Sequence, residues 1–524
     1  MFSNKWAVKN LMASPLHPIL FAIAPILLFF SYNKGELSLG DSSFLLSLGV
    51  AVLISIALWL MLGWITHDKK RAALLVSLFA ILFFSYGHVH TLINEFSFKI
   101  AGIVIGPDKL LFSIWGFLFL GCSIFILKAK RDWTMPTRFL NFVSALLVIT
   151  SLASIIPYKI REATVTLPTG SDTDNSAQEP GTANSDELRD VYYFIFDRYA
   201  NESILKKYAG FDNREFLSFL KEKGFYVASK SAANYPRTHV SLPSSLNMEH
   251  LTTLTASIDR NSASNMPLFE LIENNRVMRF LKDRGYKYIH LGDEWSGTWR
   301  NRYADIDVHY IGSFGGEFTT AFLKTTLYYP IAKKISLGKL DDREIKREKI
   351  LSKFEKLSEI PEVEGPKFVF AHFLIPHEPF VFGKNGEEVS EKDDKQGSIP
   401  AYLNQLIFTN KKVEEVVTQI LAKSKITPIV VIQSDEGPFY FTAGAWNKEA
   451  ENIRAHARIL NAYLLPGIKK TGLYQTITPV NSFRIIFNKY FGTNYELLPD
   501  ETYTIPNDRS SYQYTNVTDK IWSD

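Results

Sequence analysis

The segment Val191-Tyr-Tyr-Phe-Ile-Phe-Asp197 decides the fold, because it is a continuous run of β-branched and aromatic residues that stops at a carboxylate. Such a run is typical of a parallel strand that is buried on both faces of a sheet. Other apolar runs lead into His372-Phe-Leu-Ile-Pro-His377 and into Ile429-Val-Val-Ile-Gln-Ser-Asp435. The carboxyl ends of parallel strands meet at one edge of an open sheet, so we expect these polar residues to share a site there.

The chain around these runs alternates between strand and helix patterns from residue 190 onward. Further strands are predicted at 286–291, 367–373, 428–433 and 459–464. Helices are predicted at 213–223, 265–284, 343–358, 401–422 and 479–491. This alternation indicates an α/β domain over residues 190–524, with a mainly parallel sheet that helices cover on both faces.

The first 160 residues contain five apolar stretches that are long enough to cross a bilayer, which requires about 20 residues each. These stretches are residues 15–32, 43–66, 72–90, 110–127 and 139–157. A removable signal peptide would account for only the first of them. We therefore predict an α-helical membrane domain of five transmembrane helices over residues 1–160.

Basic residues indicate how these helices cross the membrane. One side of the predicted spans carries Lys5, Lys9, Lys69, Lys70, Arg71, Lys128, Lys130, Arg131 and Arg138, whereas the opposite loops carry few basic residues. By the positive-inside rule the N-terminus is cytoplasmic and the α/β domain is extracytoplasmic. Residues 161–189 are predicted to be a flexible linker, and the loop at 91–109 is either an interfacial helix or a connector.

Composition narrows the classes of function. The net charge of +4 over 524 residues has no basic block, so nucleic acid is not an expected partner. The single cysteine, Cys122, allows neither an intramolecular disulfide nor a cysteine metal site. The candidate ligands are therefore carboxylates, a hydroxyl and imidazoles, which indicate a divalent metal beside an activated hydroxyl nucleophile.

The segment Asn234-Tyr-Pro-Arg-Thr238 is predicted to be a turn that enters a short helix. A helix N-terminus offers free amide groups and a positive dipole to a phosphate. Thr238 is therefore either a nucleophile or an ordinary helix-capping threonine, and Ser241 is the second candidate nucleophile. Asp197 is likewise either a metal ligand or the cap of the helix that follows it.

The order of Asp197, Thr238, the His-x4-His pair His372 and His377, and Asp435-Glu-Gly437 resembles the alkaline phosphatase/sulfatase superfamily. The chain is most similar to its membrane-anchored branch, which includes lipoteichoic acid synthase and the phosphoethanolamine transferases, over roughly residues 190–490. The resemblance implies that Thr238 is the nucleophile. It also implies that Asp197, Thr238 and Asp435 bind metal, and that the histidine pair binds the substrate phosphate or a second metal.

Glu436 is the main departure from the family pattern, because relatives have histidine at this position of the Ser-Asp-His-Gly turn. A carboxylate can still bind metal, so Glu436 is retained as a predicted ligand. Three carboxylates and a hydroxyl make a hard, anionic site. We therefore expect a divalent metal cofactor, with Mn²⁺ or Mg²⁺ favoured over Zn²⁺.

Four more residues are candidate substrate contacts. His456 and Arg458 precede the strand at 459–464 and either face the phosphate or cap that strand. Trp295 and Arg300 follow the strand at 286–291 and are predicted to shape the pocket for the donor head group.

The resemblance implies a metal-dependent transferase in the bacterial inner membrane. It would move a phospholipid head group, phosphoglycerol or phosphoethanolamine, to a surface glycan or lipid-linked acceptor through a phospho-threonine intermediate. Formylglycine sulfatases need a Cys/Ser-x-Pro-x-Arg motif, and Ser241-Leu-Pro-Ser-Ser245 lacks the arginine, so phosphoryl transfer is preferred over sulfate hydrolysis. A phosphodiesterase or sulfatase-like hydrolase outside the cytoplasm, and a non-catalytic scaffold for envelope polymer export, remain alternatives.

Overall fold

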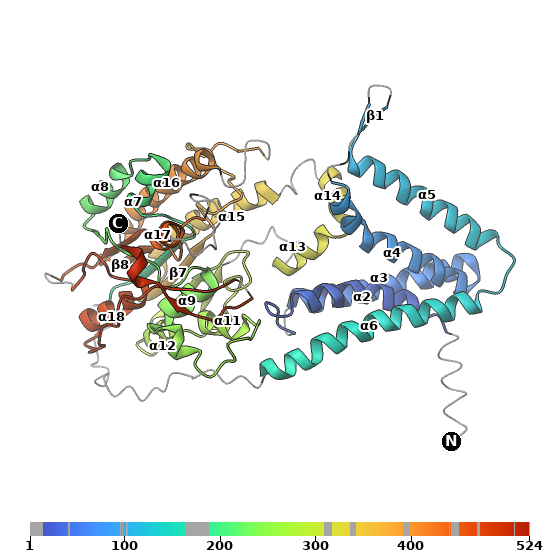
Figure 1. Cartoon of the computed structure of the whole chain (residues 1–524), viewed down its shortest axis with the longest axis horizontal. Helices are drawn as coiled ribbons and strands as arrows, with labels where there is room; N and C mark the ends of the chain where they lie inside the picture. The colour runs from blue at the N-terminus through green and yellow to red at the C-terminus, as the bar shows by residue number, and fades with distance from the viewer. Residues whose placement is uncertain are drawn as a thin grey trace, which may run out of the picture. The chain divides into compact units, whose positions relative to one another are not determined.

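The structure, a computed structural model, describes residues 14–39, 42–94, 96, 98–100, 103–163, 188–308, 317–335, 342–390, 398–439, 441, 450–468, 472–507 and 509–522. The chain forms two compact units (Figure 1). The first unit comprises Met1–Thr164 and Ser313–Asp341, and the second comprises Val165–Gly312 and Asp342–Asp524. Lys5, Lys9 and most of the predicted linker at 161–189 lie outside the described residues.

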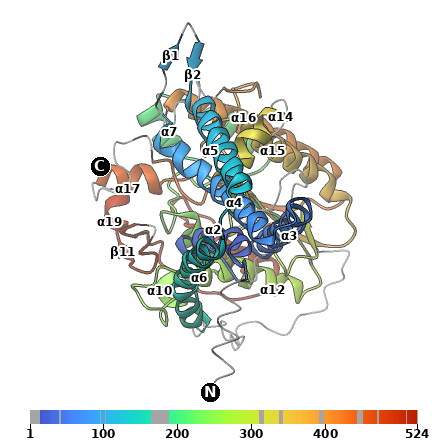
Figure 2. The same cartoon turned by 90° about the vertical axis from the view of Figure 1, so that its right-hand side faces the viewer.

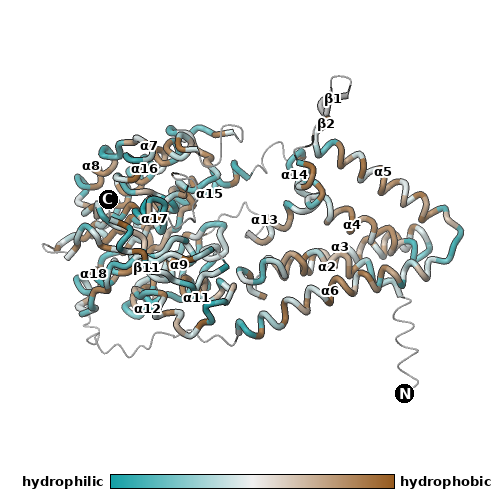
Figure 3. Tube along the Cα trace, in the orientation of Figure 1, coloured by the Kyte–Doolittle hydropathy of each residue, from teal (hydrophilic) through white to brown (hydrophobic). Residues whose placement is uncertain are grey.

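The first unit is built from apolar helices. These are α2 (His17–Tyr32), α3 (Ser42–Thr66), α4 (Lys69–Leu92), α5 (Pro107–Lys128) and α6 (Thr134–Ala163), whose traces are mostly brown in Figure 3. Among the described residues, four of them, α3 to α6, are long and apolar enough to cross a membrane, while α2 has only 16 residues. Of the two alternatives for the loop at 91–109, the interfacial helix is wrong, because this loop contains a hairpin of β1 (Phe98–Ile100) and β2 (Ile103–Ile105).

The first unit also includes a segment that the sequence assigns to the α/β domain. Two short helices, α13 (Glu317–Lys324) and α14 (Tyr328–Ile335), belong to this segment. The ring of Phe318 packs against Phe29 of α2 and Phe44 of α3, at centroid distances of 5.4 and 5.7 Å. The chain after residue 312 therefore returns to the membrane helices before the α/β domain continues at Asp342.

Gly87 of α4 makes the closest contact of this returning segment. Its backbone N–H donates to the carbonyl oxygen of Thr325 at 3.0 Å, and the N–H of Leu327 donates to the carbonyl of Phe83 at 2.8 Å. A Cβ atom at residue 87 would lie 2.6 Å from the Thr325 backbone. Only glycine therefore allows the two backbones to approach this closely.

The second unit is centred on a seven-stranded sheet with the order β4-β9-β8-β3-β7-β5-β6. The strands are β3 (Val191–Phe196), β4 (Tyr226–Val227), β5 (Lys287–Leu291), β6 (Ile306–Val308), β7 (Lys367–Phe373), β8 (Ile429–Gln433) and β9 (Asn461–Leu464). Strands β8, β3, β7, β5 and β6 are parallel, and near one edge β9 pairs antiparallel with both β8 and β4. The predicted mainly parallel sheet is confirmed, and β3 lies at its middle.

Helices bury both faces of this sheet, as expected for a continuous apolar strand. Tyr192, Phe194 and Phe196 of β3 belong to one core cluster, and the alternate residues of the strand belong to another. The first cluster includes side chains of α7 (Glu202–Ala209), α8 (Arg214–Glu222), α15 (Asp342–Glu359) and α16 (Ile399–Lys423). The second includes side chains of α9 (Thr238–Asn247), α11 (Met266–Glu273), α12 (Arg276–Lys282) and α18 (Pro479–Tyr490).

One predicted helix is divided in the structure. The helix expected at 265–284 is two helices, α11 and α12, because Asn275 adopts an extended backbone and its side chain accepts a hydrogen bond from the N–H of Met278. An asparagine at this position caps a new helix rather than continuing the old one. The short strands β4 and β6 were not predicted from the sequence.

We predict that Gly87→Ala destabilises the first unit, since its methyl group would overlap the Thr325 backbone, and overpacking of this kind costs about 1–3 kcal/mol. Thermal unfolding of the full-length protein in detergent measures the loss. Gly116→Ala in α5 is the matched control, because no atom lies within 4 Å of the added Cβ. Equal melting temperatures for the two variants would contradict the close contact.

Candidate active site

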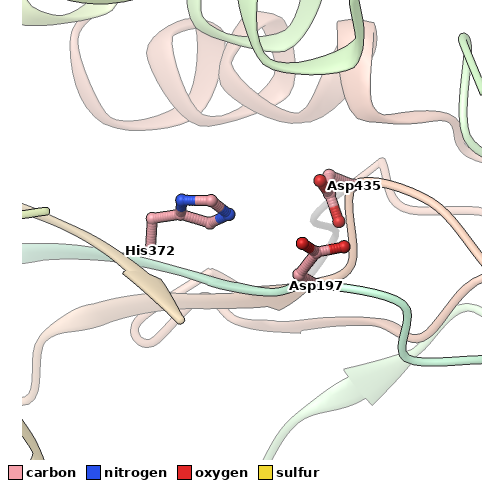
Figure 4. A group of neighbouring side chains, drawn as sticks. All are labelled: Asp197, His372 and Asp435. Carbon is pink, nitrogen blue, oxygen red and sulfur yellow. The ribbon is translucent and has the colours of Figure 1, made fainter. Parts of the chain in front are cut away.

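Three ligand-bearing side chains converge at the carboxyl edge of the sheet. Asp197 follows β3, His372 is the second-last residue of β7, and Asp435 comes two residues after β8. Because β3 lies between β8 and β7, these residues come from three adjacent strands. One ligand atom of each lies within 4.8 Å of the others, and all three side chains are buried. Figure 4 shows the imidazole of His372 pointing toward the two carboxylates.

Each of these side chains carries a buried polar atom that has no hydrogen-bond partner among the described residues. The atoms are Asp197 Oδ1, His372 Nε2 and Asp435 Oδ2. The second polar atom of two of these side chains has a partner. Asp435 Oδ1 accepts a hydrogen bond from the N–H of Glu436 at 2.9 Å, and His372 Nδ1 lies 2.9 Å from Thr298 Oγ1. An unpaired buried polar group is costly, and three in one place fit a bound divalent cation.

The acid–base state of the three residues leads to the same conclusion. Burial, then the negative charges of Asp435 and Glu436, raise the pKa of Asp197 well above its ordinary value. Burial and the charge of Glu436 raise the pKa of Asp435 to about 7. Burial lowers the pKa of His372 to about 3, so its ring is neutral and offers a lone pair. A bound divalent cation would stabilise the ionised form of the two carboxyl groups and would accept the lone pair of the neutral imidazole.

Thr238 is the first residue of α9 and is half-buried beside this group. The Thr238 side chain lowers the pKa of Asp435, so the two residues lie close together. The helix N-terminus adds amide groups and positive dipole. Ser241 lies one turn farther along α9, buried, and its hydroxyl has no partner among the described residues.

Glu436 does not join the group of possible metal ligands, contrary to the expectation from the sequence. One carboxylate oxygen accepts from Nε of Arg198 at 3.2 Å, and the other lies 3.1 Å from Nε2 of His456. Burial alone would raise the pKa of Glu436, but the hydrogen bond from His456 and the charge of Arg198 lower it to about 2. Both oxygens are therefore used to hold cationic and polar side chains.

Two arginines lie near this carboxylate and were missed in the sequence. The guanidinium groups of Arg198 and Arg237 lie 3.9 and 4.0 Å from the ring centroid of Phe439. Arg198 also donates to Glu378 at 2.6 Å and adopts a positive φ of 64°, which is rare outside glycine. Arg198 directly follows Asp197 in the chain, and Arg237 directly precedes Thr238. The backbone of each arginine is therefore adjacent to a residue of the site.

His377 lies on the loop after β7, as expected. Its Nε2 is 4.0 Å from Asp197 Oδ2, and its side chain is about one-quarter exposed. Burial and the charge of Arg198 lower its pKa to about 3, so the ring is neutral at pH 7. Trp295 packs edge-to-face on His372 at a centroid distance of 6.0 Å. The structure therefore brings both residues to the group.

Two predicted substrate contacts lie elsewhere. Arg458 donates to the carbonyl of Ile521 at 3.0 and 2.6 Å and lies 4.2 Å from the Trp522 ring, so it holds the C-terminal segment instead of facing the site. Arg300 lies after β5 in the chain and is exposed. It is not part of the group formed by Asp197, His372 and Asp435.

Helix α15 supports the histidine loop with buried lysines that the sequence analysis did not identify. Lys353 pairs with Asp293 at 2.6 Å and donates to the carbonyl of His372, and Lys346 donates to the carbonyl of His377 at 3.2 Å. These lysines share the face of α15 that carries the buried Ile350 and Phe354. Lysines on the apolar face of a helix could have indicated buried ion pairs.

The fold and this site define an enzyme of the sulfatase-like phosphotransferase or hydrolase kind. The chain belongs to the sulfatase family: the model of the Sulfatase family matches residues 210–480, more than half of the chain. This membership sets aside the alternative of a non-catalytic scaffold.

Several solved structures are similar to the chain. The C-terminal periplasmic domain of EptC from Escherichia coli is 14% identical over 62% of this chain and 91% of that chain, with a TM-score of 0.39. Lipooligosaccharide phosphoethanolamine transferase EptA from Neisseria meningitidis is 13% identical over 86% and 88%, with a TM-score of 0.35. The 2-O GAG sulfatase BT1596 is 13% identical over 59% and 72%, with a TM-score of 0.39. No curated protein matches the chain. Family membership rests on the match over residues 210–480.

We predict that added Mn²⁺ raises the melting temperature more at pH 8 than at pH 5.5, because protons compete for the carboxylates below the Asp435 pKa of about 7. That pKa lies above the unfolded value of about 3.9, so the metal-free protein loses stability as pH rises from about 4 to about 7. At 100 times its Kd, the metal would offset this loss by about 2.7 kcal/mol. A shift of equal size at both pH values, measured against an EDTA-treated sample, would contradict the assignment.

Proposed function

We propose that this protein is a metal-dependent transferase that moves a phospholipid head group, phosphoglycerol or phosphoethanolamine, to an envelope glycan through a phospho-threonine intermediate. One observation carries the proposal: Thr238 is the first residue of a helix and lies close to Asp435, beside three buried ligand atoms that have no hydrogen-bond partner among the described residues. This arrangement combines a nucleophile, an anion-binding helix end and a cation site.

In the first step, the Thr238 oxygen attacks the phosphorus of a membrane phospholipid. A new oxygen–phosphorus bond forms as the Thr238 hydroxyl gives up its proton, the bond to diacylglycerol breaks, and diacylglycerol takes up one proton as it leaves, so the protons balance. A divalent metal held by Asp197, His372 and Asp435 would lower the pKa of the Thr238 hydroxyl and offset charge on the phosphate. Asp435, which lies close to Thr238, would orient the hydroxyl.

The side chains around Thr238 have complementary roles. The amide groups of the first turn of α9 and the guanidinium of Arg237 face the negative charge that builds up on the phosphate oxygens. Glu436 and Glu378 fix Arg198 close to the same charge. His377 Nε2 lies 4.0 Å from Asp197 Oδ2, so in this proposal it contacts the entering or leaving oxygen. In the second step an acceptor hydroxyl attacks the phosphorus and releases Thr238.

The donor set of the site determines which metals it favours. The preference for Mn²⁺ or Mg²⁺ over Zn²⁺ was based on Glu436 as a third carboxylate. With Glu436 paired to Arg198 and His372 in the group, the donor set is two carboxylates and an imidazole. Imidazole suits zinc, whereas carboxylates suit manganese and magnesium, so we keep Mn²⁺ and add Zn²⁺ as a competitor.

The membrane helices support a position at the bacterial inner membrane. Four described helices are long and apolar enough to span, and α2 would be the fifth. With five spans and a cytoplasmic N-terminus, the catalytic unit lies outside the cytoplasm, where the outer leaflet supplies phospholipid donors.

The second candidate function is hydrolysis on the same site, as a phosphodiesterase or a sulfatase-like hydrolase. The match to the sulfatase family supports hydrolysis as this second candidate function. Water would replace the acceptor hydroxyl in the second step. Ser241 is buried, and the chain has no arginine at the motif position that formylglycine formation requires, so sulfate hydrolysis remains the less favoured reaction.

We predict that wild-type protein incubated with Mn²⁺ or Zn²⁺ and mixed bacterial phospholipids gains the mass of one head-group phosphate, measured by intact mass spectrometry. Thr238→Ala removes the proposed nucleophilic hydroxyl, so it should abolish the adduct. Ser241→Ala is the matched control on the same helix and should retain it. If Thr238→Ala still formed the adduct and Ser241→Ala did not, Ser241 would be the nucleophile instead.

A further inference from the structure

A cavity of about 180 Å³ lies next to the candidate active site in the second unit. We call it the side pocket. Its walls are the chain before Thr238, one face of α17 (Ala450–Ala457), and the C-terminal segment with β10 (Tyr503–Thr504) and β11 (Thr515–Asn516). Helix α17, β11 and α19 (Thr518–Ile521) lie close together in Figure 2. None of these elements has a role in the proposed first step.

Two wall residues connect the side pocket to the reacting groups. Pro236 precedes Thr238 by two residues, so their Cα atoms are at most about 7 Å apart. His456 lines the pocket, and its Nε2 lies 3.1 Å from the carboxylate of Glu436. The pocket and the site therefore share a wall that includes Pro236 and His456.

The lining of the side pocket indicates which ligands it accepts. Tyr235 and Tyr503 stack at 5.4 Å with an interplanar angle of 10°, and Ile453 adds aliphatic surface. The Thr502 hydroxyl donates to the carbonyl of Ala233 at 3.0 Å and the Thr504 hydroxyl to that of Ile505 at 3.5 Å, so each offers a ligand its oxygen as an acceptor. No aspartate or glutamate is among the described residues that line it, whereas His456 and Lys520 are. A cationic ligand such as ethanolamine would thus lack a counter-charge.

Size restricts the ligand further. Pockets that enclose drug-sized molecules measure roughly 300–1,000 Å³, and the side pocket is smaller than that range. It has room for one small ring and not for a lipid tail. Aromatic and aliphatic walls with a few hydroxyl groups suit the C–H face and hydroxyl groups of a neutral sugar.

We propose that the side pocket binds a neutral sugar unit of the acceptor glycan and presents its hydroxyl group to the phosphate on Thr238. This proposal rests on the proposed transferase function. In the step concerned, the sugar oxygen forms a bond to phosphorus, the Thr238 oxygen–phosphorus bond breaks, and the sugar hydroxyl proton is lost while the Thr238 oxygen regains one. The pocket thus determines acceptor choice and favours transfer over hydrolysis.

The test fills the pocket from two opposite walls. Ile453→Trp on α17 and Thr504→Trp on β10 place a large ring in the cavity, and neither residue belongs to the proposed catalytic group. The second variant keeps the test valid if the first does not fold. Glu451→Trp is the matched control, because its side chain is exposed on the same helix.

The probe acceptors are methyl α-D-glucopyranoside and methyl α-D-galactopyranoside, with ethanolamine as the cationic comparison, added to full-length protein in detergent with phospholipid donor and metal. We expect the filled variants to form the Thr238 adduct at the wild-type rate. Their KM for the methyl glycosides should rise about tenfold or more, and more of the adduct should be hydrolysed. Ethanolamine transfer and the Glu451→Trp control should not change. Unchanged glycoside KM values in both filled variants would overturn the proposal.

Saturation-transfer NMR of the methyl glycosides separates this proposal from the proposed function, because it needs no turnover. Glycoside binding to wild type that the filled variants lose supports the side pocket, even if no adduct forms and the transferase function fails. If the adduct forms but neither glycoside binds wild type, the transferase function stands and the side-pocket proposal is wrong. Loss of adduct formation in the filled variants would place the donor head group in the pocket and would also overturn the proposal.

Discussion

Two carboxylates buried side by side, Asp197 and Asp435, set the main constraint on the catalytic unit. Burial of an uncompensated charge costs several kcal/mol, so the folded unit must supply a cation or leave the carboxyls protonated. The neutral His372 adds a lone pair without adding charge. Glu436, which would have been a third negative ligand, is compensated by Arg198 and His456. The site thereby separates one cation position from an arginine-lined region that faces the phosphate.

The parts of this fold that depend on local pattern could be predicted from the sequence. A buried parallel strand is apolar on both faces, so β3, β7 and β8 were predictable from continuous apolar runs, and β7 has the predicted bounds. Their order in the sheet brings residues after the strands together, so Asp197 and Asp435 were identifiable as neighbours. Helices α16 and α18 were predictable because each has an amphipathic pattern.

The parts that depend on distant partners could not be predicted. Helices α13 and α14 are short, and they pack on membrane helices that lie more than two hundred residues earlier in the chain. The motif around Glu436 specifies a position but not the direction of its side chain, which Arg198 and His456 determine. Arg458 was assigned by its place before a strand, yet its partner is the C-terminal Ile521. The sequence left His372 as a ligand of the substrate phosphate or of a second metal, and its position beside the carboxylates comes from the pairing of β7 with β3.

The central claim is that Asp197, His372 and Asp435 hold a divalent metal while Glu436 holds Arg198. The most direct test is the metal content of purified full-length protein, measured by inductively coupled plasma mass spectrometry, for Asp435→Asn and Glu436→Gln beside wild type. The account predicts that Asp435→Asn loses the metal and that Glu436→Gln retains it. If Asp435→Asn retained the metal and Glu436→Gln lost it, this assignment would be wrong and Glu436 would be a metal ligand.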